Sequence, residues 1–241
     1  PMETAGNALA FPAGIFTDNF HDAAKKINFN RALKNSLIVT GVSVVLIVFF
    51  SSMSGYVIAR NHMKNRFFGF LDKTFMSSQM LPFQVVMVSV YRLFRMYGLL
   101  NTLAGEIIML TGMSVAYASF LYVGFVKSIP YELEEAARID GCSKWQIFWK
   151  VIFPLLKPIQ ATLIILVGVQ TFNDFTNPLY FLPGSENTTV QLTLYSYQGQ
   201  LASSFNLLFA DIIVITLPML VLFVIFNKKI VDGMVAGSVK G

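Results

Sequence analysis

Long apolar runs alternate with short polar and charged segments along the whole chain. The clearest run, residues 35–59, carries no charge between Lys34 and Arg60, and about 20 apolar residues are enough for a helix to cross a bilayer. Four later runs have a similar character: 71–91, 103–126, 159–182 and 207–226. The pattern therefore predicts an all-α integral membrane protein, a polytopic helical bundle with about five spans in this chain.

Several positions inside these runs predict local features of the spans. Pro82 should kink the second span, which a transmembrane helix tolerates when its neighbours satisfy the freed carbonyl. Glu106, in the first turn of the third span, is expected to be solvated near the outer surface, and Asp211 to lie near the outer end of the fifth. Small residues that permit close helix packing occur in the first span: Gly41, Ser43, Ser51, Ser52 and Gly55.

Composition narrows the class of protein further. The chain is 55% hydrophobic and only 13% charged, whereas an average soluble domain is about 25% charged. The single cysteine excludes an internal disulfide, and two isolated histidines argue against a metal site. The net charge of +5 is scattered between apolar runs, which argues against nucleic-acid binding.

The distribution of lysine and arginine predicts which side of the membrane each segment faces. Basic residues are most frequent after residue 59, in 128–158 and after residue 227, so we expect these segments in the cytoplasm. The loop 183–205 then faces outward, and four basic residues near the N-terminus count weakly against this arrangement. The predicted organisation is an extracytoplasmic or interfacial segment 1–34, a membrane domain 35–227 and a cytoplasmic tail 228–241.

Residues 128–158 are the longest densely charged segment between apolar runs. Pro130 fits the first turn of a helix that opens with three glutamates, and Gly141 fits its end. Ser143 and Gln146 fit a capping box that starts a second helix. Helical spacing predicts apolar faces on both helices: Leu133, Ala136 and Ala137 on the first, and Trp145, Phe148, Trp149 and Ile152 on the second. We therefore predict two short helices at an angle, joined at Gly141.

The same segment resembles the EAA loop of binding-protein-dependent ABC importer permeases. It has Glu135-Ala136-Ala137, three residues, Gly141, nine residues and then Val151-x-Phe153-Pro154, where the family usually has I-x-L-P. The resemblance implies a coupling helix that docks into a cleft on a separate ATP-hydrolysing subunit. The coupling residues that it implies are Glu135, Ala136, Ala137, Asp140, Gly141 and Pro154. The alternative interpretation is a short amphipathic helix lying on the membrane surface.

Polar residues cluster in the fourth run, within roughly two helical turns: Gln170, Asn173, Asp174 and Asn177. Polar side chains at membrane depth are unfavourable unless they face protein or water. A solute path and interhelical hydrogen bonding both explain the cluster, and the two interpretations stay open. On a regular helix three of these residues share the path-facing stripe, with Asp174 on its flank holding a neighbouring helix or the helix's own bend.

Three stretches resemble the carbohydrate branch of this permease family. Residues 172–179 read F-N-D-F-T-N-P-L, similar to W-N-D-F-x-x-P-L with Phe172 in place of tryptophan. Residues 193–200 resemble the last external loop, and the ending G-M-V-A-G-S-V-K-G resembles G-L-T-A-G-A-V-K-G. The resemblance implies that the loop reaches a sugar-binding protein and that the tail contacts the ATPase pair. The residues concerned are Tyr197, Gln198, Gly199 and Gln200 in the loop, and Gly237 and Lys240 in the tail.

The resemblance implies one membrane-spanning subunit of an ATP-driven, binding-protein-dependent oligosaccharide importer in a bacterial cell membrane. The chain carries no nucleotide-binding G-x-x-x-x-G-K-[ST] motif, so it is expected to be no enzyme and to bind no cofactor, with ATP and Mg²⁺ on partner subunits. The expected partners are a second homologous permease, two ATP-binding subunits, an extracytoplasmic sugar-binding protein and membrane lipid. The family's first helix is expected to be absent from this chain.

Two other functions stay open at this stage. The nearer is an ABC importer permease for a solute other than a carbohydrate, such as an amino acid or a peptide. The more distant is a secondary transporter, which should show paired broken helices in inverted halves. No such pairing is visible in the sequence.

Overall fold

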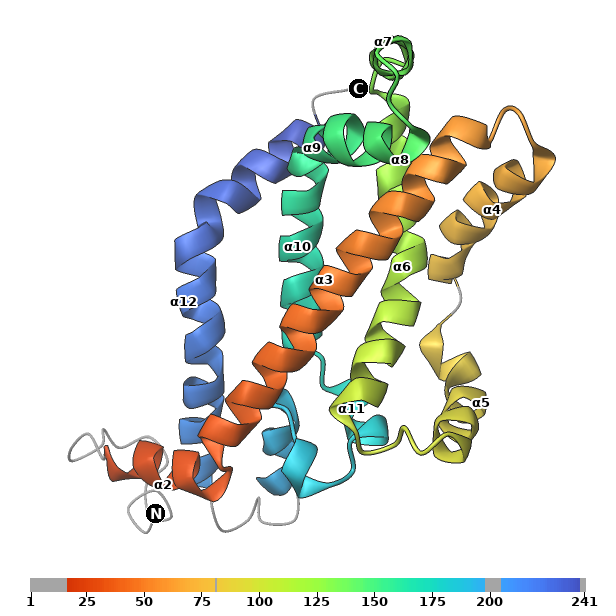
Figure 1. The fold of residues 1–241 in the computed structure, drawn as a ribbon. Coiled ribbons are helices and arrows are strands. Elements are labelled where there is room, and N and C mark those ends of the chain that lie inside the picture. The colour runs from red at the N-terminus through yellow and green to blue at the C-terminus, as the bar shows by residue number, and fades with distance from the viewer. Residues whose placement is uncertain (1–16, 81, 198–204, 239–241) are drawn as a thin grey trace.

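The computed structural model describes residues 17–80, 82–197 and 205–238 (Figure 1). No strand occurs within these ranges, which confirms the all-α prediction. The elements in chain order are α2 (Asp18–Lys26), α3 (Phe29–Asn61), α4 (Arg66–Ser77), η1 (Ser78–Met80), α5 (Phe83–Met96), α6 (Leu103–Lys127), α7 (Glu132–Ile139), α8 (Lys144–Ile147), η2 (Phe148–Ile152), α9 (Phe153–Leu155), α10 (Lys157–Phe172), α11 (Thr176–Phe181), η3 (Ser185–Asn187), η4 (Gln191–Tyr197) and α12 (Phe205–Ser238).

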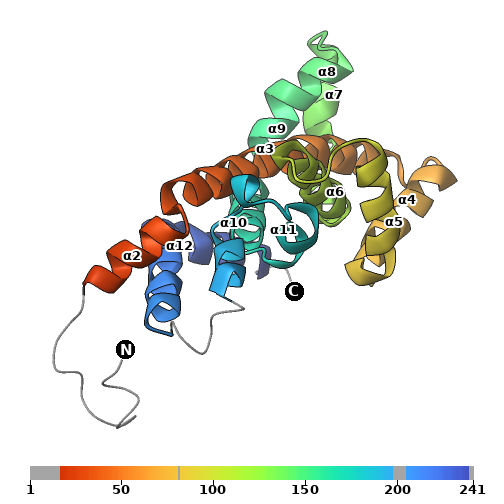
Figure 2. The same ribbon diagram turned by 90° about the horizontal axis from the view of Figure 1, so that it is seen from below.

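The helices form a bundle with two distinct ends (Figures 1 and 2). α2 and α11 lie at one end, and α7, α8 and α9 lie at the other, where α12 also finishes. The segment 128–158 and the C-terminal end of α12 are therefore on the same side of the bundle. α12 continues as one helix through residue 227 to Ser238, so the predicted boundary between membrane domain and tail is not a helix end. The placement of this side in the cytoplasm stays a prediction.

The closest helix pair is α3 with α6. A Cβ atom added at Gly55 would lie 2.5 Å from Cβ of Tyr122 and 3.0 Å from the carbonyl oxygen of Ser119. Gly55 therefore lets the two backbones approach, as its position in the apolar run predicted. Gly41 has a different environment, because no atom lies within 4 Å of its added Cβ. The three predicted serines are all buried: Ser43, Ser51 and Ser52.

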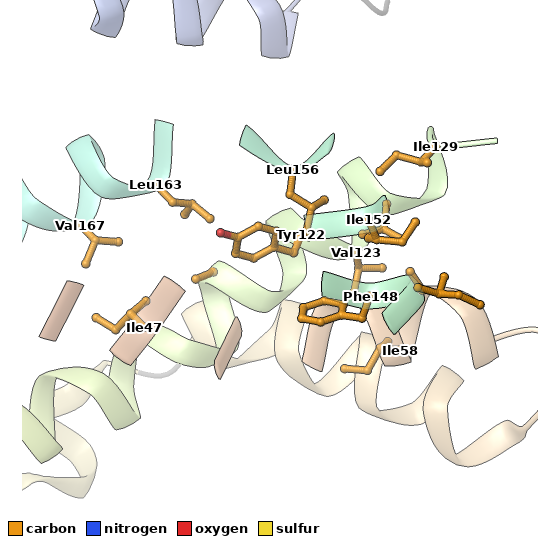
Figure 3. Close-up of a cluster of buried hydrophobic side chains, with 14 of the residues drawn as sticks. Ile47, Ile58, Tyr122, Val123, Ile129, Phe148, Ile152, Leu156, Leu163 and Val167 are labelled. Carbon is orange, nitrogen blue, oxygen red and sulfur yellow. The ribbon is translucent and has the colours of Figure 1, made fainter. Parts of the chain in front are cut away.

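The largest hydrophobic core joins the spanning helices to the segment 128–158 (Figure 3). α3 contributes Ile47 and Ile58, and α6 contributes Tyr122. Phe148 and Ile152 of the π-helical turn η2 are buried in the same cluster. α10 adds further side chains to it, including Leu163 and Val167. The charged segment is thus anchored in the bundle and does not lie loosely on its surface.

The predicted span 71–91 is not one kinked helix. α4 ends at Ser77, the short turn η1 follows, and α5 begins after Pro82, whose backbone is extended with ψ 133°. The prediction of a continuous span is wrong because a proline in a helix lacks the N–H of one helical bond and its ring collides with the carbonyl four residues earlier. Here the chain leaves the helix altogether and starts a new one.

The predicted span 159–182 is also interrupted. α10 ends at Phe172, and α11 begins at Thr176. A helix through this region would leave the carbonyl of Asp174 without a partner, because Pro178, four residues later, has no N–H to donate. At the first turn of a separate helix the same proline is tolerated. The expectation of one regular helix through residues 170–177 is therefore wrong.

The described helices differ in whether they are long and apolar enough to cross a membrane. α3 and α6 are each long and apolar enough to cross a membrane. Lys144–Leu155 and Lys157–Phe172 pass the same test together and are bent by 71°. The apolar part described in α12, Asn206–Val221, is shorter. These helices agree with a polytopic membrane protein, and the number of five spans stays a prediction.

Candidate functional site

The segment 128–158 forms two short helices joined at Gly141, as predicted. α7 carries three glutamates in its first turn and Arg138 in its last, the charge order that a helix dipole favours. It ends in a Schellman motif, in which Gly141 has φ +83° and donates to the carbonyl of Arg138, while Cys142 donates to that of Ala137. Pro130 lies before the helix and not in its first turn, because Tyr131 is the capping residue.

The second half of the segment starts at Ser143 with the predicted capping box. The hydroxyl of Ser143 accepts from the N–H of Gln146 at 3.3 Å, and Oε1 of Gln146 accepts from the N–H of Ser143 at 2.8 Å. Trp145 departs from the predicted apolar face, because it is 60% exposed. Pro154 is exposed in α9, next to the sharp bend into α10. The second half thus presents an indole and a proline to the surroundings of the bundle.

α7 has one buried and one exposed face, and these divide the predicted coupling residues. The exposed ones are Glu135, Ala136, Asp140 and Gly141. Ala137 is buried beside Glu134, so the predicted common face of Leu133, Ala136 and Ala137 is wrong. Leu133 is 42% and Ile139 86% exposed. The outer face of α7 therefore combines acidic groups with large apolar side chains that stay partly or mostly exposed among the described residues.

Glu134 is the buried acid of α7, and its role is not apparent from the sequence. Its Oε1 accepts from Nε of Arg60 at 2.6 Å, and its Oε2 accepts from the hydroxyl of Tyr56 at 2.8 Å. Arg138 approaches the same carboxylate to 3.8 Å. No local pattern separates Glu134 from the other glutamates of its turn, because its partner Arg60 lies 74 residues earlier.

Tyr131, at the start of α7, is surrounded by basic side chains. Arg60, Lys64 and Arg138 lie 5.6, 5.5 and 5.2 Å from the centre of its ring. The guanidinium of Arg138 also donates to the tyrosine hydroxyl at 2.8 Å, and this hydrogen bond raises the pKa of Arg138. The basic residues after the first predicted span thus contact the coupling segment directly.

A pocket of about 360 Å³ lies at the junction of α10 and α11, against α6. Four of its lining residues are the predicted polar cluster: Gln170, Asn173, Asp174 and Asn177. The opposite wall comes from three residues that no sequence pattern singles out: Leu110, Met113 and Ser114. A cavity that combines apolar walls with a few convergent polar groups is typical of small-molecule sites. Among the described residues, no group of three His, Cys, Asp or Glu side chains is placed to hold a metal ion.

The pocket residues have different local roles. The carboxylate of Asp174 accepts from the N–H groups of Thr176 and Asn177 at 3.0 and 3.3 Å, and from Nδ2 of Asn177 at 2.6 Å. Asp174 thus holds the first turn of α11 in the way that a capping residue does. Asn173 ends α10 and accepts from Nε2 of Gln191 at 3.0 Å, which links the pocket to η4.

Glu106 is fully buried, so the prediction that it is solvated is wrong. Neither of its carboxylate oxygens has a hydrogen-bond partner among the described residues. Leu110 and Met113 follow it at four and seven residues on the same face of α6, so Glu106 lies next to the pocket wall. Its burial could not be predicted, because α11, which packs against α6, was expected to continue the fourth span.

Replacing Glu106 by glutamine should stabilise the protein. Burying a carboxyl without a partner is unfavourable, because it must either keep its charge in a low-dielectric site or take up a proton on folding, whereas an amide of the same shape is neutral in both states. We expect the free energy of unfolding to rise by about 1 kcal/mol, measured by thermal denaturation of the purified assembly. Glu186→Gln, at an exposed position, is the matched control and should change nothing. Lost transport at unchanged stability would contradict this interpretation and place Glu106 in the solute path.

Residues 183–197 are the described part of the loop that is predicted to face outward, called the outer loop below, and they are hydrogen-bonded to the N-terminal part of α3. Nδ2 of Asn35 donates to the carbonyls of Glu186 and Thr188 at 3.1 and 3.0 Å. The hydroxyl of Ser36 accepts from the N–H of Val190 at 2.9 Å. These bonds hold η3 and η4 over the end of the bundle where α2 and α11 lie.

The remaining predicted site residues lie at the edges of the described ranges. Tyr197 is the last residue of η4, and Gly237 lies in the last turn of α12. Four predicted residues lie outside the described part of the chain: Gln198, Gly199, Gln200 and Lys240. The contacts expected of this loop and of this tail therefore stay predictions.

The chain is similar to known membrane subunits of transport systems. The family model described as "Binding-protein-dependent transport system inner membrane component" matches residues 47–235. The probable starch degradation products transport system permease protein AmyC of Thermoanaerobacterium thermosulfurigenes is 33% identical over 99% of this chain and 86% of its own length. The melibiose/raffinose/stachyose import permease protein MelC of Bacillus subtilis is 36% identical over 96% of this chain and 83% of its own length.

A solved structure shares the fold. It is a crystal structure of a bacterial ABC transporter involved in the import of the acidic polysaccharide alginate. The matched chain superimposes with a TM-score of 0.74 at 24% identity, over 90% of this chain and 81% of that chain. The likeness between the two chains is one of helix arrangement.

Proposed function

The chain belongs to the family of binding-protein-dependent transport system inner membrane components, and on that premise we propose that it is one permease subunit of an ATP-driven carbohydrate importer. The solutes are oligosaccharides, in keeping with relatives named for starch degradation products and for melibiose, raffinose and stachyose. The observation that carries the proposal is the pocket, where hydrogen-bonding side chains gather in a mostly apolar bundle. Such groups match the hydroxyls of a sugar.

The ATP-driven part of the proposal rests on α7. Its outer face exposes Leu133 and Ile139 together with Glu135, the composition of a helix that inserts into a groove on a partner. Since the chain has no phosphate-binding loop, two ATP-binding subunits supply ATP and Mg²⁺. A second homologous permease completes the path, and an extracytoplasmic sugar-binding protein delivers the solute. α7 and the C-terminal tail then face the cytoplasm.

The pocket supports a weak and reversible solute site. Gln170, Asn173 and Thr176 are exposed polar side chains on its wall, and Phe175 adds an aromatic surface. A transporter has to release its cargo, so few and exposed hydrogen-bonding groups suit the task better than a tight cage. In the importing cycle, ATP-driven closure of the ATPase pair moves α7, and the pocket is open alternately to the two sides of the membrane.

Substitutions in the segment between α10 and α11 should show which residues serve transport and which serve assembly of the complex. Asn173→Leu removes a polar group of the pocket wall, and we expect uptake to fall at least about tenfold, which corresponds to 1.4 kcal/mol. Asp174→Ala removes the acceptor of two N–H groups at the start of α11, and we expect less assembled complex, with a loss of about 1 kcal/mol in stability. Asp174→Asn keeps an oxygen for these groups and is the matched control.

Uptake and size-exclusion profiles of the three variants measure both effects. If Asn173→Leu reduced assembly while Asp174→Ala reduced only uptake, the roles assigned to the two residues would have to be exchanged.

The test of the function itself is reconstitution. The permease pair, the ATPase and the binding protein are co-purified and placed in proteoliposomes, and uptake of labelled oligosaccharides is followed with and without ATP. We expect uptake that needs both ATP and the binding protein. A binding protein that takes up only amino acids or peptides would favour the importer of another solute class. Uptake without any ATPase would favour the secondary transporter.

A further inference from the structure

α7 stands apart from the spanning helices (Figures 1 and 2). It projects beyond the end of the bundle and packs mainly against α8 and η2, its neighbours in the chain. A helix in this position can move with a partner subunit without moving the bundle, unless specific side chains connect it to a spanning helix. The contacts of Glu134 make such a connection to α3.

The ion pair between Glu134 and Arg60 is buried and has a fixed hydrogen-bond geometry. Glu134 has a side chain only 1% exposed, and its partner Arg60 is 15% exposed. Nη2 of Arg60 also donates to the carbonyl of Ile129 at 3.1 Å, so one guanidinium holds both α7 and the turn that leads into it. Separating the buried carboxylate from Arg60 is unfavourable, because the other nearby cation, Arg138, lies farther away at 3.8 Å and is exposed. The two residues therefore move together.

A second contact ties the other half of the coupling segment to the same turn of α3. Tyr56 donates its hydroxyl to Glu134, and its ring lies 5.3 Å from that of Phe148 in η2, centre to centre. Both halves of the segment thus meet α3 within the five residues from Tyr56 to Arg60. The adjacent Gly55 lets α3 approach α6 closely, since a Cβ there would lie 2.5 Å from Cβ of Tyr122.

α3 connects its contacts with α7, between Tyr56 and Arg60, to the outer loop. It is one unbroken helix from Phe29 to Asn61, and Asn35 and Ser36 near its beginning hold the loop that carries Gln191. Gln191 in turn bonds Asn173 of the pocket. A rigid helix that is attached at one end to α7 and at the other to a loop over the pocket can transmit a displacement between them.

We propose that Glu134 and Arg60 are positioning residues that transmit the movement of α7 to α3, an inference that rests on the proposed importer function. They touch neither solute nor nucleotide. Their function is to make α3 follow α7 when the ATPase subunits close. An apolar contact of equal volume would keep the segment in place but let α7 slide, because dispersion contacts have no fixed direction.

The experiment replaces the pair without unfolding the protein. In Arg60→Met/Glu134→Leu both charges give way to apolar side chains of similar size, a change that buried ion pairs often tolerate without loss of stability. The complex with ATPase and binding protein is reconstituted, and the number of ATP molecules hydrolysed per solute imported is measured. We expect normal assembly and a ratio raised roughly tenfold, within the 5–150-fold range of coupling between sites. Arg60→Lys, which keeps the charge, should raise the ratio less.

The matched control is the ion pair between Lys127 and Asp72, whose charged atoms are 3.0 Å apart. Their side chains are 40% and 20% exposed, and the pair joins α6 to α4 and does not involve α7. Lys127→Met/Asp72→Leu should leave the ratio unchanged. If Arg60→Met/Glu134→Leu assembled and kept the wild-type ratio, the inference would be overturned while the importer function stood. If the wild-type complex imported no carbohydrate at all, the proposed function would fail instead. If Arg60→Met/Glu134→Leu did not assemble, Arg60→Lys decides, since a wild-type ratio there also overturns the inference.

Discussion

Gly55→Val should abolish the assembled protein. A Cβ at this position meets Cβ of Tyr122 at 2.5 Å and the carbonyl of Ser119 at 3.0 Å, and neither a backbone atom nor the first atom of a side chain can turn away. α3 and α6 would have to separate, which removes close packing along their whole crossing. We expect a loss of roughly 3 kcal/mol in stability, the upper range for overpacking, seen as aggregation in fluorescence-detected size exclusion.

The control for this change is Gly41→Ala on the same helix. An alanine there meets no atom within 4 Å and has a better helix propensity by about 1 kcal/mol. We expect normal or slightly improved expression and thermal stability. Equal damage from both substitutions would mean that α3 tolerates no side chain at either glycine, and the close approach at Gly55 would lose its explanation.

Gly141→Pro should stop transport while leaving the protein in the membrane. Proline fixes φ near −65°, whereas Gly141 has φ +83°, and proline has no N–H for the carbonyl of Arg138. The end of α7 would be redirected, and with it the exposed Ile139 and Asp140. Because proline cannot adopt this turn, we expect uptake to fall by more than about tenfold, with ATP hydrolysis no longer stimulated by the loaded binding protein.

Gly141→Asn tests whether backbone conformation is the cause. Asparagine tolerates the left-handed region and occurs naturally after helix ends. It should retain most of the uptake of the wild-type protein. If the Asn and Pro variants were equally inactive, the backbone turn would not be the reason for glycine at residue 141. The partner subunit would instead have to pack so closely there that no side chain fits.

Features that depend on neighbouring residues could be predicted from the sequence. The turn at Gly141 needs only a glycine after an amphipathic helix, and the capping box needs only Ser143 and Gln146 at their spacing. The polar residues of the pocket were recognisable because Asn173 and Asp174 interrupt an otherwise apolar run.

Features that depend on residues far away in the sequence could not be predicted. Three glutamates share the first turn of α7, and only the position of Arg60 in space decides that Glu134 is the buried one. Glu106 is at a helix start, where solvent is the ordinary neighbour, yet it is fully buried on a helix against which α11 packs. The end of α10 was missed for another reason. The residues on both sides of the polar cluster are apolar, so the run as a whole is long enough for one span, although Asp174 holds the first turn of a separate helix.

The attachments of the outer loop determine how it should respond to proteases and to inserted peptides. Surface loops ordinarily accept an epitope tag or a protease cut, but here the carbonyls of Glu186 and Thr188 are bonded to α3, and Thr193 reaches Asp211 on α12. An insertion between Glu186 and Thr193 would pull these anchors out of register. The described part of this loop should therefore be cleaved slowly and accept tags poorly, in spite of its place at the outer edge of the bundle.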